Sequence, residues 1–292
     1  MARLRAMVRR GAIALLVLLL FLLTYMSQIE PRWLEVKRVD LVLPRCDRTL
    51  EDFKLVQISD LHVSSLHRHT LDRVVAQVNA QAADAIVITG DFVTQGDDLD
   101  ADRLILVALK QLRAKIGVYA VLGNHDHWTN PLIVRHFLRE NQIRDLSNQA
   151  IALTPTPLIL AGIDDPWVGQ PDLPGLLQRM PPGNCAILLA HEPNFADTAA
   201  QTRRFALQLS GHSHGGQIRL HRFYNLPPMS DRYPSGQYPV GKMIQYTNRG
   251  IGMGGVAMRL RSRPEITVFH LQGPQALDQE ISHFIKRKAK NP

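Results

Sequence analysis

Five short clusters of metal-binding residue types, each directly after an apolar run, constrain the fold of this chain more than any other feature. They are Asp60-Leu61-His62, Gly90-Asp91, Gly123-Asn124-His125-Asp126, His191 and Gly211-His212-Ser213-His214-Gly215-Gly216-Gln217. Carboxylate, amide and imidazole groups suit hard to borderline divalent ions such as Mn²⁺, Fe²⁺ and Zn²⁺. No single cluster is specific, but the ordered set indicates one hydrolytic site that holds two metal ions.

The apolar runs before these clusters have the length and composition of buried strands. The strands expected to end at a cluster are 55–59, 85–89, 118–122, 186–190 and 205–210. Helical spacing over 70–80 and 102–112 separates the first three strands. This alternation predicts parallel βαβ units in an α/β domain, in which ligands gather at the carboxyl ends of the strands. We therefore expect the clusters to meet at one edge.

The remaining chain predicts further short elements. Helices are expected over 131–141, 173–179 and about 275–288, and short strands over 150–153 and 158–162. Residues 218–255 are rich in Gly, Pro and Tyr and predict long loops, of which 233–255 is expected to form part of a substrate wall. Residues 243–247 and 265–271 predict late strands of a second sheet.

The N-terminus has the pattern of a membrane anchor or a signal peptide. Arg3, Arg5, Arg9 and Arg10 precede an uncharged apolar run over 11–28. The run is a little short for a span of about 20 residues, which favours a signal peptide. The absence of a small-x-small cleavage site after it favours an uncleaved anchor, and we favour the anchor.

The basic N-terminal flank also predicts a topology. Arginines before a span tend to stay in the cytoplasm, which places the catalytic domain on the outer face of the membrane, the inner membrane if the source is bacterial. Arg32, Lys37 and Arg38 beyond the run reduce this asymmetry. The expected organisation is an anchor or signal segment over 1–29, a connector and first strand over 30–50, and one catalytic domain over 51–292.

The net charge and the cysteine content restrict the possible partners and the compartment of this protein only weakly. The formal charge of +8 favours anionic partners such as a phosphorylated substrate or an acidic membrane, or serves solubility alone. Nucleic acid is not expected, because no basic arm with interleaved aromatics is present. Cys46 and Cys185 lie far apart without metal-like spacing, so we expect two unrelated thiols, which leaves the redox compartment open.

The residue types suggest individual roles. Asp60 and His62 lie two residues apart after a strand, where both can reach one ion. Asp91 follows a glycine that allows a tight turn, and a carboxylate can bridge two cations. The Asn124 amide is a neutral ligand, which leaves the adjacent His125 free to act on the substrate.

The two later clusters supply nitrogen ligands. His212 and His214 lie on a glycine-flanked turn, where a purely structural role is hard to justify. His191 ends a buried strand before Glu192-Pro193 and provides one more imidazole.

The order Asp-x-His, Gly-Asp, Gly-Asn-His-Asp, His, Gly-His-x-His resembles the signature of the calcineurin-like metallophosphoesterases, from about residue 53 to 271. Gly-His-Ser-His-Gly-Gly-Gln together with the apolar N-terminus is similar to a bacterial membrane-associated branch of that family. Members of that branch are described as phosphodiesterases acting on cell-envelope or lipid-linked substrates. The resemblance implies a four-layer α/β/β/α sandwich, here with an N-terminal hydrophobic helix.

The resemblance also implies a ligand set for two divalent ions, Mn, Fe or Zn. Asp60, His62 and His214 would hold one ion, Asn124, His191 and His212 the other, and Asp91 would bridge them. The paired ions would share and acidify a water. His125, which is not a ligand, would stabilise charge or protonate the leaving oxygen. Asp126 is expected either to hold His125 or to be a solvated turn carboxylate.

Other polar residues are expected outside the site. His67, His69, His127 and His221 are expected at the surface, with His127 alone close enough to touch substrate. Asp164 and Asp165 fit an Asp-Pro turn and are not assigned to the site.

The leading expectation is a membrane-anchored, metal-dependent phosphodiesterase for a phosphorylated small molecule or lipid. A phosphomonoesterase with the same metals is one alternative. A pyrophosphatase of a nucleotide-linked lipid such as UDP-2,3-diacylglucosamine is another, although such precursors are usually cytoplasmic. A non-enzymatic alternative is a metal-stabilised envelope-binding protein, which a missing ligand would favour; no ligand position departs from the pattern.

Overall fold

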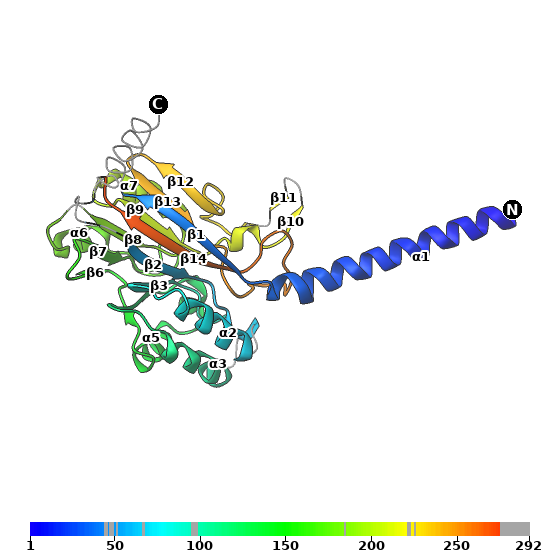
Figure 1. Cartoon of the computed structure of the whole chain (residues 1–292), viewed down its shortest axis with the longest axis horizontal. Helices are drawn as coiled ribbons and strands as arrows, with labels where there is room; N and C mark the ends of the chain where they lie inside the picture. The colour runs from blue at the N-terminus through cyan, green and yellow to red at the C-terminus, as the bar shows by residue number, and fades with distance from the viewer. Residues whose placement is uncertain are drawn as a thin grey trace, which may run out of the picture.

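The chain forms a two-sheet domain from which one long helix projects (Figure 1). The computed structural model describes residues 1–43, 46, 50, 52–65, 68–94, 99–183, 185–220, 223–224 and 226–274. The expected helix over 275–288 lies outside these residues, as do His67, His221 and the side chain of His69.

The first sheet has six strands. Their order is β1 (Glu35–Val42), β14 (Glu265–Gln272), β2 (Phe53–Ile58), β3 (Ala85–Thr89), β4 (Gly117–Val121) and β5 (Arg144–Asp145). β14 runs antiparallel to β2, and all other neighbours are parallel. The strands β2, β3 and β4 therefore end at the same edge, as the βαβ pattern predicts.

The second sheet also has six strands. Their order is β12 (Gly236–Val240), β13 (Met243–Thr247), β9 (Leu207–Ser210), β8 (Ala186–Leu189), β7 (Ile159–Gly162) and β6 (Gln149–Ala152). The outer pairs β12–β13 and β6–β7 are antiparallel, and the inner strands are parallel. A separate hairpin pairs β10 (Arg219–Leu220) with β11 (Phe223–Tyr224).

Helices cover the outer face of each sheet. The first sheet carries α2 (Arg68–Asn79), α3 (Leu99–Leu106) with its extension η4 (Val107–Gln111), and α5 (Pro131–Glu140). The second carries α6 (Leu173–Arg179) and α7 (Ala196–Gln201). The short elements η3 (Val63–Ser65), α4 (Asn124–Thr129), η5 (Pro193–Phe195) and η6 (His214–Gly216) lie in the strand-end loops.

Three apolar cores separate these layers. One joins the first sheet to its helices, with Ile86 of β3 against Val74 of α2. The second fills the space between the sheets, where Val87 and Leu189 are fully buried. The third joins the second sheet to α6 and α7 and includes Leu188. Successive residues of β3 and of β8 thus serve opposite faces, and the four-layer α/β/β/α expectation is confirmed.

Two strand expectations were wrong. Residues 265–271 were expected in the second sheet, but β14 lies between β1 and β2 of the first. The residues of β14 are buried on both faces of the sheet. This burial is typical of a central strand, but it does not indicate which of the two sheets contains the strand. Residues 218–255 were expected to be loops, but they contain β10, β11 and β12; Gly236 and Pro239 hide the edge strand β12 from a propensity reading.

The N-terminal helix α1 (Ala2–Thr24) runs without a break into η1 (Tyr25–Ile29) and η2 (Glu30–Arg32). It is long and apolar enough to cross a membrane by length and composition. Its side chains from Arg3 to Leu23 are exposed, whereas Met26, Glu30 and Pro31 are buried against the domain.

The cysteine expectation was also wrong, because Cys46 and Cys185 form a disulfide with Cα atoms 4.2 Å apart. They are separated by 139 residues in sequence, so spacing gave no signal. Cys46 follows β1 and Cys185 immediately precedes β8, and both are buried in the core between the two sheets. The bond therefore ties one sheet to the other.

We expect loss of this disulfide to lower the free energy of unfolding by about 2–5 kcal/mol, since it closes a long loop in the unfolded chain. The measurement is urea unfolding of the full chain in detergent for Cys46→Ala, Cys185→Ala and the double variant. The double variant should be no less stable than the weaker single variant. A double variant much less stable than either single one would show that the two cysteines act independently.

Candidate metal centre

All five sequence clusters come together where strands of the two sheets end. Asp60 and His62 follow β2, and Asp91 follows β3. The remaining residues lie after β4 (Asn124, His125), β8 (His191) and β9 (His212, His214). Because these strands are parallel within each sheet, their carboxyl ends meet at one edge of the sandwich.

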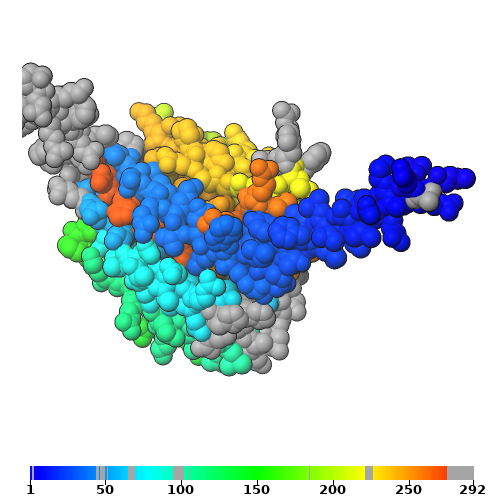
Figure 2. Space-filling model, turned by 45° about the vertical axis from the view of Figure 1, so that its right-hand side comes forward, coloured from blue at the N-terminus to red at the C-terminus, as the bar shows by residue number. Residues whose placement is uncertain are grey.

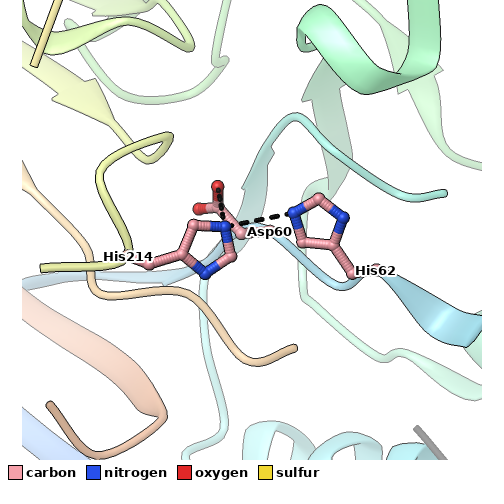
Figure 3. A group of neighbouring side chains, drawn as sticks. All are labelled: Asp60, His62 and His214. Carbon is pink, nitrogen blue, oxygen red and sulfur yellow. Dashed lines mark hydrogen bonds and ion pairs between the residues drawn. The ribbon is translucent and has the colours of Figure 1, made fainter. Parts of the chain in front are cut away.

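Asp60, His62 and His214 form one group of converging ligand atoms (Figure 3). The Nε2 atom of His214 lies 3.1 Å from Nε2 of His62 and 3.5 Å from Oδ1 of Asp60. All three residues are buried. Two imidazole nitrogens and a carboxylate oxygen at such separations match the donor set of a divalent transition-metal ion.

Asp91, His191 and His212 form a second group beside the first. The Nε2 atom of His191 lies 3.1 Å from Oδ2 of Asp91. The same carboxylate oxygen lies 3.5 Å from Nε2 of His62, which belongs to the first group. Asp91 therefore lies between the two groups. Asn124, which is also buried, heads α4 beside His125.

Hydrogen bonds on the far side of the imidazoles fix their orientation. His191 directs Nδ1 at the carbonyl of Thr89, 2.6 Å away, which leaves Nε2 toward Asp91. His212 directs Nε2 at the carbonyl of Pro228, 2.8 Å away, and His62 places Nδ1 2.9 Å from Thr94 Oγ1. Such outer partners set the tautomer and aim the other ring nitrogen, as they do in metal sites.

The backbone of this cluster is strained. Asp60, His62, Asp91, His212 and His214 have φ angles of 50°, 40°, 57°, 69° and 48°. Left-handed conformations are uncommon for non-glycine residues and persist where the surroundings enforce them. All five residues lie in the loops that follow β2, β3 and β9. Gly123 is required for a different reason, because an added Cβ there would collide with the Asp91 carboxylate and the His191 ring.

Burial keeps most of the imidazoles neutral. It lowers the pKa of His62 to about 4 and that of His212 to about 3, and it lowers the pKa of His214 well below the ordinary value. Burial also opposes ionisation of Asp91, but the charge and hydrogen bond of His191, together with the nearby His62 and His125, outweigh it and hold the pKa of this carboxyl far below normal. Burial opposes protonation of His191 as well, but the charge of Asp91, their hydrogen bond and the nearby carboxyls of Asp60 and Glu192 raise its pKa well above the ordinary value. His62, His212, His214 and Asp91 are thus in the protonation states that metal ligation requires, whereas His191 would release a proton to bind an ion.

Two buried oxygens in the cluster test whether it fits a metal ion. Asp60 Oδ2 and Asn124 Oδ1 have no hydrogen-bond partner within the described part of the chain. A buried oxygen without a partner costs free energy, and a cation would satisfy both atoms. The donor chemistry, the neutral His62, His212 and His214, the ionised Asp91 and these two oxygens therefore fit divalent ions.

Asp126 has a role different from either expectation. Its carboxylate does not contact His125 in any described hydrogen bond; it accepts backbone N–H groups of Asp91, Phe92, Val93 and Gly123 at 2.8–3.3 Å. Burial and the nearby Asp91 raise the pKa of Asp126 to about 7, against the effect of these donors. The carboxylate thus joins the loop after β3 to the start of α4 and positions Asp91.

A cavity of about 370 Å³ opens over the cluster and is lined by His125, Asn124 and Asp91. Trp128 and Trp167, which the sequence did not assign to the site, also line it, with ring centroids 5.1 Å apart. Trp128 lies four residues after Asn124 in the same helix, α4, so its position was a usable signal. Trp167 had none, because its loop carries no ligand.

Residues expected outside the site have definite roles. His127 was expected at the surface, but it is half-buried and lies 2.9 Å from Asp164 Oδ1. Burial opposes protonation of His127, yet this ion pair raises its pKa. Asp165 accepts the backbone N–H groups of Trp167 and Val168 and so positions Trp167. Of 233–255, expected to be a substrate wall, the described residues contribute only Gly254 to the cavity.

Comparisons with known proteins agree on one family. Residues 53–216 match the family model described as calcineurin-like phosphoesterase. The metallophosphoesterase YkuE of Bacillus subtilis is 34% identical over 258 residues, covering 85% of this chain and 89% of that protein. A transmembrane protein with metallophosphoesterase domain from Bos taurus is 32% identical, covering 81% of this chain and 57% of that protein. A solved structure, TT1561 of Thermus thermophilus, gives a TM-score of 0.48 at 13% identity, over 68% of this chain and 90% of that one.

Replacing Asp126 by asparagine should destabilise the folded state by about 2–4 kcal/mol, because an NH2 group replaces one carboxylate oxygen and faces buried N–H donors. Urea unfolding measures the loss. Asp172→Asn, which changes an exposed carboxylate that accepts one backbone N–H, is the matched control and should cost much less. Equal losses in the two variants would contradict a positioning role for Asp126.

Proposed function

Because this chain belongs to the calcineurin-like phosphoesterase family, whose members are metal-dependent hydrolases, we propose that it is a membrane-anchored phosphodiesterase for cell-envelope or lipid-linked phosphates. One observation carries the proposal: two groups of buried ligand atoms, Asp60–His62–His214 and Asp91–His191–His212, meet at Asp91 on the floor of an open cavity, and a third grouping of His62, Asp91 and His125 overlaps both. This arrangement suits two ions rather than one, since a single carboxylate faces both groups.

The ligand assignment follows the two groups. Asp60, His62 and His214 would hold one ion, and Asn124, His191 and His212 the other, with Asp91 between them. Bound divalent ions would supply charge neutralisation at the phosphoryl oxygens and a more acidic water. The nitrogen and oxygen donors suit Mn²⁺, Fe²⁺ or Zn²⁺ without selecting among them.

His125 is the proposed catalytic residue, because it lines the cavity and belongs to neither of the two groups assigned to the ions, while its ring still lies within reach of His62 and Asp91. Its backbone N–H donates to Asp91 Oδ1 at 2.9 Å, which fixes the main chain beside the proposed bridging carboxylate. Its ring packs edge-on against His62 and Trp128, with centroids 4.8 Å and 4.9 Å away. A half-buried imidazole held in this way can stabilise developing charge or give a proton to the leaving oxygen.

The proposed location is the outer face of the membrane. The helix α1 would be the anchor, with its arginines in the cytoplasm. The Cys46–Cys185 disulfide supports this topology, because disulfides persist mainly in oxidising compartments outside the cytoplasm. The bond favours an oxidising compartment, which the cysteine spacing alone left open, and weighs against a cytoplasmic substrate.

A nucleotide-linked lipid pyrophosphatase is the second candidate, and one feature favours it. Trp128 and Trp167 both line the cavity and are about 37% exposed, so they offer aromatic surface to a planar group. A nucleobase would suit that surface, whereas the disulfide argues against a cytoplasmic precursor. A phosphomonoesterase remains the alternative if the cavity excludes a second ester group.

The full chain, stripped of metal and reloaded with Mn²⁺, should cleave a chromogenic phosphodiester faster than the matching monoester. His125→Ala should lower kcat by about 10²–10⁴-fold, because it removes general acid catalysis. Asp91→Asn should lower both activity and bound metal, measured by mass spectrometry. His136→Ala, at an exposed position on α5, should change neither.

Two results would revise the proposal in different ways. Cleavage of the monoester alone would retain the metal centre and replace the substrate class. Two bound metals with no turnover on a diester, a monoester or a nucleotide diphosphate would favour the envelope-binding alternative.

A further inference from the structure

The anchor helix joins the domain without a flexible linker. Leu23 is exposed, whereas Met26, only three residues later, is buried in the domain surface. The helical path continues from α1 through η1 and η2 to Arg32. Figure 2 shows the helix seated directly on the domain. If α1 spans a bilayer, the surface around Met26 lies within about one helical turn, or 5 Å, of the membrane.

One segment, 258–263, holds the base of the helix. The backbone N–H of Arg259 donates to the carbonyl of Met26 at 2.9 Å. The backbone N–H of Ser262 donates to Glu30 Oε1 at 2.6 Å. The Arg263 guanidinium stacks over the ring of Trp33, 4.5 Å from its centroid. These contacts fix the direction in which the helix leaves the domain.

The same segment contacts the metal centre. The hydroxyl of Ser262 donates to the carbonyl of His214 at 2.7 Å. The fully buried Arg259 guanidinium donates to the carbonyls of Gly250 and Gly252, and the Gly252 N–H donates to the carbonyl of Asp60 at 2.7 Å. The base of the anchor and two of the ligand loops are therefore one connected unit.

Exposed apolar and basic side chains lie on this base and on the chain bonded to segment 258–263: the N–H of Arg219, next to Leu220, donates to the carbonyl of Leu260, and the N–H of Met258 donates to the carbonyl of Val256. We call the set the anchor-side face, and it comprises Ile29, Arg32, Trp33, Leu220, Val256 and Arg261. Leu220 is 56% exposed and Val256 is 58% exposed. The face reaches the cavity, because Gln217, a cavity residue, donates to the carbonyls of both Gly254 and Val256.

We propose that the anchor-side face rests in the headgroup layer of the membrane, so that the cavity takes phosphates carried on lipids at that surface. The apolar side chains would be buried among the acyl-chain ends, Trp33 would lie at the interface, and Arg32 and Arg261 would pair with anionic lipid phosphates. The substrate half of this inference rests on the proposed function. A lipid could then present its headgroup to the metal centre while its chains stay in the bilayer.

Depth-dependent quenching tests the face without any turnover. The full chain with Trp33→Phe is reconstituted in vesicles of phosphatidylglycerol and phosphatidylcholine brominated near the headgroup end of the chains. A tryptophan is then added by Leu220→Trp, by Val256→Trp or, as control, by Leu132→Trp, a 72% exposed position on α5. We expect the first two added tryptophans to lose about half of their emission and the control almost none.

Quenching at 220 and 256 no greater than at 132 would overturn the membrane contact. The substrate half is tested by the double variant Leu220→Asp/Val256→Asp in the same vesicles. We expect its rate on a bilayer-resident phosphodiester lipid, divided by its rate on a soluble diester, to fall about tenfold, with Leu132→Asp unchanged in this ratio. An unchanged ratio would overturn the lipid-access inference. Quenching as expected with no turnover on any diester would uphold the membrane face and reject the proposed function.

Discussion

The core between the two sheets is the interaction on which the rest of the structure depends. It aligns the carboxyl ends of β2, β3 and β4 with those of β8 and β9, so that loops from both sheets face each other. Each of the two groups proposed to hold an ion draws on both sheets; in the first, Asp60 and His62 follow a strand of one sheet and His214 a strand of the other. The Cys46–Cys185 bond lies in the same core and ties together the halves that the site requires.

Asp126 and Arg259, which are not among the described cavity residues, hold the site in an energetically costly arrangement. Left-handed backbone at five clustered residues and buried ionisable groups both oppose folding. Asp126 offsets part of this cost by accepting four backbone N–H groups around Asp91. Arg259 offsets another part by donating to the carbonyls of Gly250 and Gly252. Burial lowers the pKa of Arg259 to about 10, so its guanidinium stays charged at neutral pH. Metal binding would offset much of the remaining cost.

The sequence predicted what depends on local pattern. The apolar runs before Asp60, Asp91 and Asn124 located their strands to within two residues, and the glycine-flanked clusters identified the residues that the structure brings together. It did not predict features that depend on tertiary placement. A doubly buried run such as β14 reads the same in either sheet, and the partner of Cys46 lies 139 residues away. Trp167 reaches the cavity from a loop without ligands, which no spacing could indicate.

The rigid base of α1 bears on how such an enzyme would choose its substrate. Metal ions and one histidine act on the phosphate group alone, so they distinguish poorly among phosphodiesters. The described cavity walls add two tryptophans, three apolar residues, Gly254, and Ser213 and Gln217, whose side chains hydrogen-bond to backbone groups, so the walls offer little specific hydrogen bonding to a substrate. Discrimination must then come partly from which phosphates reach the cavity. If α1 is the membrane anchor, its contacts through Glu30 and Arg259 would set the height and orientation of the cavity above the bilayer. The position of the cavity would thereby supply a selectivity among phosphodiesters that the metal ions and His125 cannot supply.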